Sequence, residues 1–320
     1  MNSISVVVPC YNEEKVINIF YAELKKIIDT MDAKFEILFV DDGSSDLTEV
    51  KIRSLAEDDR VKYVLFSRNF GKEAAMYAGM RYASGDFVVL MDADLQDPPH
   101  LIPEMYRMIK THGCDCVAAR RSNRRNEPAV RSIFAHSFYK IFKKITGLNV
   151  VDGARDFRMM SRKMVDSILC LREHNRFSKG IFLWVGYTTK WIEYENVERT
   201  AGITKWSFGK LLAYAFMGIT AFSYAPLYIP LIAGVLMFAI SLAVGAMLVI
   251  RLFLKLPIES FCWGASLVVF MFAVLLTSVG ILGVYIARID RESMARPKYI
   301  VKCSNIEMKK TKEDVYRAKE

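Results

Sequence analysis

The sequence lacks several patterns that mark common protein classes. Its six cysteines include no CxxC pair, and its four histidines are scattered along the chain. We therefore expect reduced, mostly buried thiols rather than a disulfide framework or a metal site. No GxxxxGK[ST] loop occurs, which argues against a P-loop nucleotidase. The first ten residues show no basic leader or cleavage site, so we expect the residues that follow to stay in the cytoplasm.

Charge is absent from two long stretches of the 320-residue chain. No Asp, Glu, Lys or Arg occurs from Leu211 to Ile250 or from Ser260 to Ala287. About 20 apolar residues are enough to cross a bilayer, so each stretch predicts one transmembrane helix. Pro226 and Pro230 indicate that the first helix begins near residue 224. The predicted spans are residues 224–250 and 262–287.

Two segments before the spans are predicted to lie along the membrane surface. Residues 130–146 carry apolar side chains at helical spacing with basic residues among them, and residues 206–223 are rich in aromatics. Both patterns are typical of interfacial helices. For the first segment, a surface helix that packs on the preceding domain is the alternative.

The distribution of charge predicts a topology. Residues 288–320 contain ten Lys or Arg against six acidic residues, whereas the loop from Arg251 to Phe261 contains two against one. The positive-inside rule places this basic tail in the cytoplasm, and two spans return the N-terminal domain to the same side. We expect a plasma-membrane protein with both termini in the cytoplasm. Beside membrane spans, the net charge of +9 favours an anionic lipid surface or a phosphate substrate over nucleic acid.

The first 120 residues alternate strand and helix patterns. Short apolar runs predict strands at Ile4–Val8, Phe35–Val40, Val61–Phe66, Phe87–Met91 and Cys116–Ala119. Amphipathic patterns predict helices near Glu13–Thr30, Gly71–Ala83 and His100–Thr111. This alternation predicts an α/β domain whose parallel sheet is covered on both faces. Ligands bind at the carboxyl ends of such strands, and acidic clusters follow the second and fourth strands here.

The acidic cluster after the fourth strand predicts a metal site. Asp92 and Asp94 stand two residues apart where the chain leaves the strand, so both carboxylates can face one divalent cation. Mg²⁺ and Mn²⁺ prefer oxygen ligands and often take one or two carboxylates plus substrate phosphates. Such a cation stabilises a departing diphosphate. The alternative is a solvated turn in which Asp97 caps the helix after Pro98 and Pro99.

The acidic pair after the second strand predicts a nucleoside site. Asp41 and Asp42 can accept hydrogen bonds from a base and from ribose hydroxyls, and Gly43 permits a tight turn. The alternative is an ordinary turn with Ser45 or Asp46 as the N-cap of the next helix.

An arginine cluster predicts a phosphate partner. Five arginines lie within 12 positions, with Glu127 as the one acid among them: Arg120, Arg121, Arg124, Arg125 and Arg131. Guanidinium groups suit bidentate recognition of phosphate. The alternative is a mobile, solvated basic loop beside the anionic membrane surface.

Taken as a set, these motifs resemble the inverting glycosyltransferase family 2. The resemblance covers residues 3–290 and rests on six stretches: Val6–Glu13, Asp41–Ser44, Ser67–Lys72, Asp92–Asp97, Arg155–Arg158 and Thr204–Ser207. It points to the polyprenyl-phosphate branch, which contains dolichyl-phosphate mannose synthases and bactoprenol glucosyltransferases. Processive members carry a Gln-x-x-Arg-Trp motif, whereas residues 175–180 here read Asn-Arg-Phe-Ser-Lys-Gly. A polymerase is therefore not expected.

The resemblance implies a fold and residue roles. The fold is a GT-A type, Rossmann-like nucleotide-diphospho-sugar transferase domain at residues 1–205, followed by the two transmembrane helices. The implied sites are the nucleotide-sugar (Pro9, Tyr11, Glu13, Asp42), the Mg²⁺ or Mn²⁺ ion (Asp92, Asp94, Gln96) and the acceptor phosphate (Arg120, Arg131, Lys205). Asp94 and Asp156 are the candidate catalytic residues. Three roles are open for Asp156: a general base, a carboxylate that orients Arg155 and Arg158, or an ion-pair partner that only stabilises the domain.

The implied reaction is a single displacement that inverts the anomeric carbon. The acceptor is polyprenyl (undecaprenyl) phosphate, and the donor is UDP-glucose first, then UDP-N-acetylglucosamine or GDP-mannose. The rivals are transfer to a diacylglycerol or protein hydroxyl, and a non-catalytic membrane subunit that binds nucleotide-sugars. The expected partners are the donor, the lipid and the membrane, without nucleic acid. We also expect a homo-oligomer (a tetramer in resembling enzymes), a flippase and a downstream transferase of cell-envelope glycosylation.

Overall fold

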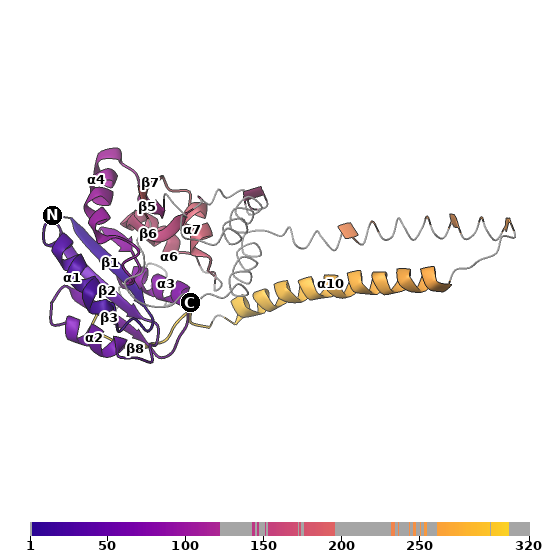
Figure 1. Cartoon of the computed structure of the whole chain (residues 1–320), viewed down its shortest axis with the longest axis horizontal. Helices are drawn as coiled ribbons and strands as arrows, with labels where there is room; N and C mark the ends of the chain where they lie inside the picture. The colour runs from indigo at the N-terminus through magenta and orange to yellow at the C-terminus, as the bar shows by residue number, and fades with distance from the viewer. Residues whose placement is uncertain are drawn as a thin grey trace, which may run out of the picture. The chain divides into compact units, whose positions relative to one another are not determined.

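The computed structural model of the chain describes three main stretches of residues. These are 2–121, 151–195 without 152, 172, 174 and 175, and 261–306 without 295, with isolated residues at 143–146 and 232–254. The chain divides into two compact units, Met1–Ala215 together with Pro297–Glu320, and Phe216–Arg296. Figure 1 shows the α/β part of the first unit and the long helix α10 of the second.

The first unit is built on one mixed sheet of eight strands. The strands are β1 (Ser3–Cys10), β2 (Lys34–Asp41), β3 (Val61–Phe66), β4 (Phe87–Leu90), β5 (Cys116–Arg121), β6 (Ala154–Ser161), β7 (Thr189–Tyr194) and β8 (Val301–Ser304). Their order across the sheet is β7-β5-β6-β4-β1-β2-β3-β8. Strands β4, β1, β2 and β3 run parallel, and β5 pairs with β7 in parallel. The antiparallel members are β6, between β4 and β5, and β8 beside β3.

Helices cover both faces of this sheet (Figure 1). They are α1 (Ile17–Ile28), α2 (Thr48–Leu55), α3 (Lys72–Tyr82), η1 (Pro99–Leu101), α4 (Ile102–His112), α6 (Arg162–Leu169) and α7 (Ser178–Trp184). Phe20 of α1 and Met105 of α4 join Val6 and Val8 of β1 in one apolar core. Helix α3 lies on the opposite face, because a Cβ on Gly79 would meet the side chain of Val7 at 2.1 Å. Successive strand residues point to opposite faces, so β1 is buried on both sides and is apolar almost throughout.

The α/β alternation predicted for the first 120 residues is confirmed, with β3 at the predicted bounds. The strands predicted in this stretch run parallel to one another, as expected, and the antiparallel strands β6 and β8 come from residues beyond it. Helix α1 begins at Ile17 rather than near Glu13, since the backbone N–H groups of Val16 and Ile17 both donate to the Glu13 carbonyl in a preceding turn.

The segment expected to be a basic tail at 288–320 differs from that expectation. Residues 288–293 continue α10, and Val301–Ser304 form the edge strand β8. The Tyr299 ring stacks on Phe66 with ring centroids 5.0 Å apart, and the Asn305 side chain accepts from the backbone N–H of Tyr63 at 2.7 Å. This edge of β3 is therefore covered by the same chain, which removes an unpaired strand edge.

The second unit contains α10 (Phe261–Ser293), a helix of 33 residues. This helix includes the second predicted span, residues 262–287. None of the helices among the described residues combines the length and the apolarity that a bilayer crossing needs. The first predicted span, 224–250, falls almost wholly outside the described residues, as do the interfacial helices predicted at 130–146 and 206–223.

Candidate active site

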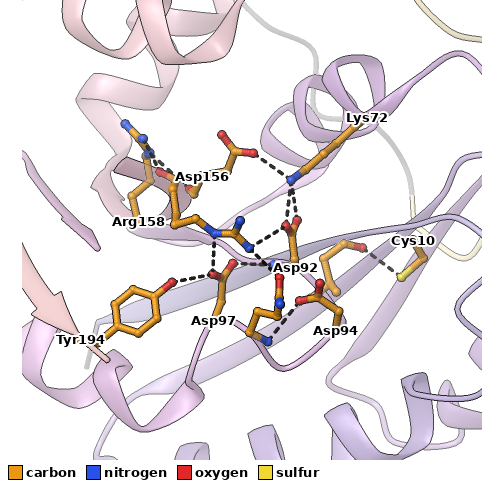
Figure 2. Close-up of polar contacts among 11 residues, drawn as sticks. Cys10, Lys72, Asp92, Asp94, Asp97, Asp156, Arg158 and Tyr194 are labelled. Atoms are coloured by element: carbon orange, nitrogen blue, oxygen red, sulfur yellow. Dashed lines mark hydrogen bonds and ion pairs between the residues drawn. The ribbon is translucent and has the colours of Figure 1, made fainter. Parts of the chain in front are cut away.

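The candidate site lies where β1, β2 and β4 end, together with the start of α3 and the first residues of β6. Figure 2 shows the polar side chains that converge there, among them Lys72, Asp92, Asp94, Asp97 and Asp156. The topology explains the convergence. Strands β4, β1 and β2 are parallel neighbours, so the loops that follow them open at one edge of the sheet.

The loops after β1 and β2 are joined by hydrogen bonds. The backbone N–H of Asn12 donates to the Ser44 hydroxyl at 2.8 Å, and the N–H of Ser45 donates to the Asn12 side chain at 2.9 Å. Asn12 has φ of 54°, an uncommon conformation for a residue other than glycine. Gly43 has φ of 66°, and a Cβ there would lie 2.4 Å from the Arg68 carbonyl carbon. The Gly in the acidic turn is therefore required by both conformation and space.

Asp42 links this pair of loops to the start of α3. Its Oδ1 accepts from the backbone N–H groups of Phe70 at 2.6 Å and Gly71 at 3.1 Å, and its Oδ2 accepts from Gly71 at 2.9 Å. Burial raises the pKa of Asp42 to about 6, opposed by those two N–H donors. The carboxylate is thus fixed in place and is charged at neutral pH.

The loop after β4 is organised by Asp97, which is fully buried. Its Oδ2 accepts from the backbone N–H of Asp92 at 3.1 Å, and its Oδ1 accepts from the Tyr194 hydroxyl at 3.2 Å. The alternative that Asp97 caps the next helix is wrong, because no side chain caps η1. Burial raises the pKa of Asp97 to about 6, and Arg155, whose Nε lies 3.5 Å away, opposes the rise. Asp97 thereby folds the acidic loop back on itself.

Lys72, the first residue of α3, bridges two carboxylates of the site (Figure 2). Its Nζ lies 2.7 Å from Oδ1 and 2.9 Å from Oδ2 of Asp92, and 2.8 Å from Oδ2 of Asp156. Asp92 belongs to the loop after β4, whereas Asp156 stands in β6. One ammonium group therefore joins the metal motif to the motif expected on the acceptor side.

These charges shift one another's ionisation. The partial removal of the Lys72 ammonium from water acts to lower its pKa, but the carboxylates of Asp156 and Asp92 outweigh this and hold that pKa above its usual value. Burial likewise acts to raise the pKa of Asp156, but Lys72 and then Lys179 hold it well below its ordinary range. Asp156 is therefore ionised at neutral pH and is a weak proton acceptor.

The two arginines beside Asp156 have different environments. Arg155 faces the acidic loop, with its Nη2 3.4 Å from the Gln96 amide oxygen and 3.9 Å from Oδ2 of Asp92. Arg158 is 3% exposed and stacks on the Phe182 ring, with its Nη2 donating to the Arg155 carbonyl at 2.9 Å. Arg155 thus belongs to the site, while Arg158 stabilises the fold behind it.

The remaining predicted site residues fall into three groups. Pro9 lies in β1 opposite Val40, with Tyr11, which is 37% exposed, in the loop that follows. The backbone N–H of Glu13 donates to the Thr48 hydroxyl at 2.8 Å. Arg120, a predicted contact of the acceptor phosphate, lies in β5 and forms an ion pair with Glu193 of β7. Arg131 and Lys205 lie outside the described residues, so their roles stay predictions.

The sequence reasoning missed three contributors. Lys72 stands in one of the six stretches without a predicted role, and Arg155 is predicted only as a partner of Asp156. Asp97 has a stated role only in the alternative in which it caps a helix. A rule of charge balance could have found two of them. Carboxylates that are buried need nearby cations, and Lys72 and Arg155 are basic residues of two of the quoted stretches.

The oxygen donors of the acidic loop suit a divalent cation. Asp92 and Asp94 supply carboxylates, and the Gln96 side chain supplies an amide oxygen. The ammonium group of Lys72 lies against both oxygens of Asp92, so the positive charge beside this carboxylate comes from a lysine side chain. Among the described residues, no group of three or more His, Cys, Asp or Glu side chains is arranged to hold a metal. A pair of carboxylates completed by substrate phosphates is nevertheless a usual set for Mg²⁺.

The sheet, its loops and the acidic strand-end motif define a class: a glycosyltransferase with the Rossmann-like GT-A fold of nucleotide-sugar enzymes. Comparison with known proteins gives the family. The profile of glycosyl transferase family 2 matches residues 5–169. The chain belongs to glycosyl transferase family 2.

Relatives match along most of the chain. It is 41% identical over 301 residues to the bactoprenol glucosyl transferase of Shigella phage SfV, covering 93% of this chain and 98% of that protein. It is 40% identical over 309 residues to the putative glycosyltransferase CsbB of Bacillus subtilis, covering 95% and 92%. Among solved structures, mannosyl-3-phosphoglycerate synthase from Rubrobacter xylanophilus matches at 17% identity with a TM-score of 0.47, covering 69% of this chain and 72% of that one.

Proposed function

We propose that the protein transfers glucose from UDP-glucose to undecaprenyl phosphate, with inversion at the anomeric carbon. The observation that carries this proposal is the 41% identity to a bactoprenol glucosyl transferase over 93% of this chain. Because the match covers 93% of the chain, it extends beyond the residues of the α/β domain. Transfer of N-acetylglucosamine or mannose to the same lipid is the alternative, because no residue described here distinguishes the sugars.

In the proposed reaction, an oxygen of the lipid phosphate attacks the anomeric carbon while the bond to the nucleoside diphosphate breaks. A phosphate monoester has its second pKa near 6, so the acceptor is already an anionic nucleophile at neutral pH. Asp156 is ionised and paired with Lys72 at 2.8 Å. This favours an orienting role for Asp156 over that of a general base, since a carboxylate with a lowered pKa removes protons poorly.

We also propose that Asp92, Asp94 and Gln96 hold Mg²⁺ or Mn²⁺. The bound ion would neutralise the negative charge that develops on the departing diphosphate. Asp42 would bind the nucleoside, because its carboxylate is fixed by Phe70 and Gly71 beside the loop that contains Tyr11. Arg155, the second residue of β6, faces the acidic loop, where it can position a phosphate group.

A membrane location is part of the proposal. The two uncharged stretches of the sequence support transmembrane helices at 224–250 and 262–287, and α10 exposes large apolar side chains such as Phe272 and Leu276. We propose that both termini face the cytoplasm and that the interfacial segments bring the lipid phosphate to the site. A cysteine placed between residues 252 and 260 should then react with an impermeant reagent added outside the cell. Labelling of the C-terminus from outside would contradict the topology.

A transfer assay with purified full-length protein in detergent tests the proposed reaction. Undecaprenyl phosphate is supplied with radiolabelled UDP-glucose, UDP-N-acetylglucosamine or GDP-mannose, and label is measured in the organic extract. The expected result is transfer of glucose that disappears in Asp94→Asn. Transfer of another sugar would change the donor assigned. Release of label only as free sugar would contradict the proposed acceptor. The absence of turnover with every donor would favour a non-catalytic binding protein.

A further inference from the structure

Lys72 takes a position in this site that the proposed reaction does not use. Both oxygens of Asp92 lie within 2.9 Å of its ammonium nitrogen, and Asp156 lies 2.8 Å from the same atom. Asp92 is one of the proposed metal ligands. An ammonium group that contacts both oxygens of Asp92 competes with a divalent cation for this carboxylate, because the two positive charges repel at such short range.

The surroundings allow this contact to exchange. The Lys72 side chain is 42% exposed, against 23% for Asp92 and 19% for Asp156, so solvent and ligands reach the cluster. The backbone before Lys72 is fixed, because the Gly71 N–H donates to Asp42 at 2.9 Å. The long aliphatic stem carries a compact charge that can turn about several bonds. The anchor is thus fixed, while the side chain has the length and the rotatable bonds to place its charged end differently.

We propose that Lys72 is a positioning residue that neutralises Asp92 until the divalent cation and nucleotide-sugar bind, and then releases Asp92 while keeping its contact with Asp156. Asp156 provides the second carboxylate that holds the ammonium in place after release, and Arg155 remains near Asp92 at 3.9 Å. The released charge stays beside the donor and acceptor phosphates. The inference rests on the proposed metal ligands.

Direct measurement of Mn²⁺ binding tests the inference without relying on turnover. Free Mn²⁺ is followed by electron paramagnetic resonance in the purified full-length protein, without donor. Lys72→Met should bind Mn²⁺ about tenfold more tightly than the wild type, because a competing positive charge is gone. Lys72→Arg, which keeps the charge, should stay within about threefold of the wild type. The same Lys72→Met protein should transfer glucose more slowly, since Asp156 has lost its partner.

The matched control is Lys26→Met, which removes an exposed lysine that pairs with Glu23 at 2.6 Å on α1. Its Mn²⁺ affinity should equal that of the wild type. Unchanged or weaker binding in Lys72→Met would overturn the inference and leave the proposed function intact. A wild type that binds no Mn²⁺, even with UDP, would overturn the proposed metal site and the inference together. If Lys72→Met does not fold, Lys72→Gln gives the same measurement.

Discussion

The two halves of the site are held together by different forces. On the nucleoside side, the loops after β1 and β2 are fixed by hydrogen bonds to backbone groups, as between Asn12 and Ser44 or Asp42 and Gly71. On the metal side, charged side chains hold one another, as in the contact of Lys72 with Asp92 and Asp156. The first half is fixed by hydrogen bonds to the backbone, and the second half is held by ion pairs whose exchange is proposed above.

This difference fits the roles proposed for the two halves. A nucleoside binds and leaves unchanged, so a fixed complementary surface is sufficient, and a fixed backbone reduces the entropy lost on binding. The metal side is proposed to bind a divalent cation and to stabilise the negative charge that develops on the departing diphosphate. Groups that carry charge and can change partners suit that task. Substitutions in the two halves should therefore fail in different ways.

The largest expected effect is on the metal side. Asp94 is 8% exposed, and its Oδ1 accepts from the backbone N–H of Gln96 at 3.1 Å. Asp94→Asn keeps an oxygen for that hydrogen bond but removes the charge. We expect a loss of turnover of about 10³-fold, typical of removing a major electrostatic stabiliser of the transition state. Stability should change by less than about 1 kcal/mol, because the hydrogen bond is retained.

Chelation provides the companion measurement. Activity should vanish in EDTA and return with Mn²⁺ or Mg²⁺, while the thermal midpoint of the α/β domain changes little. Full activity in the chelator would show that the acidic loop acts without a metal.

A smaller loss is expected at Asp156. In Asp156→Asn the ammonium of Lys72 loses one of its two carboxylates. We expect turnover to fall by about 10²-fold, the usual cost of a reacting group that is no longer well oriented. The acid limb of the pH profile should remain, because it reflects the second pKa of the lipid phosphate, near 6. Loss of that limb in the variant would instead identify Asp156 as the proton acceptor.

On the nucleoside side, substitution should change affinity rather than turnover. Asp42 has a pKa raised to about 6 by burial, so its carboxylate becomes protonated as the pH falls through 6. The apparent KM for the donor should therefore rise below pH 6 in the wild type. In Asp42→Asn it should be raised at all pH values, by about tenfold at pH 7, the value of one charged hydrogen bond. A KM that depends equally on pH in both proteins would remove Asp42 from nucleoside binding.

The same shift has a consequence for stability. The folded-state pKa of Asp42 lies above its ordinary value of 3.8. The protonated group therefore contributes stability that is fully present below pH 4 and is lost as the pH rises through 6. The free energy of unfolding of Asp42→Asn, relative to the wild type, should increase between pH 4 and pH 7. This measurement needs no substrate.

The sequence predicted the parts of this site whose signal is local. Apolar runs located β1 to β5 because a strand buried on both faces must be apolar, and the acidic motifs followed from their place at strand ends. It did not predict that Lys72 lies between Asp92 and Asp156, because that contact depends on β6 entering the sheet antiparallel beside β4. Strand β8 was missed for a similar reason, since its four residues pair with a strand more than 200 residues earlier in the chain.

The smallest expected effect on activity comes from the C-terminal segment, which contributes packing rather than charge or nucleoside contacts. The Tyr299 ring stacks on Phe66 at 5.0 Å with planes 12° apart, and Phe66 also contacts Phe70 edge to face. Tyr299→Ala removes one ring from this cluster. We expect the free energy of unfolding to fall by about 1–2 kcal/mol, as for loss of a half-buried aromatic contact. Tyr299→Phe, which keeps the ring, should retain most of that stability.

Turnover and donor KM in Tyr299→Ala should stay within about twofold of the wild type at a temperature where the protein is folded, because Tyr299 is not among the proposed site residues and its loss lowers the stability of the fold. Phe70 nevertheless donates its N–H to Asp42 at 2.6 Å, so the aromatic cluster reaches the nucleoside loop. A donor KM raised tenfold without loss of stability would mean that the C-terminal segment positions Asp42. The nucleoside half would then depend on residues that follow α10. Its geometry would no longer be explained by the hydrogen bonds of its own loops, and the comparison with the half held by ion pairs would fail.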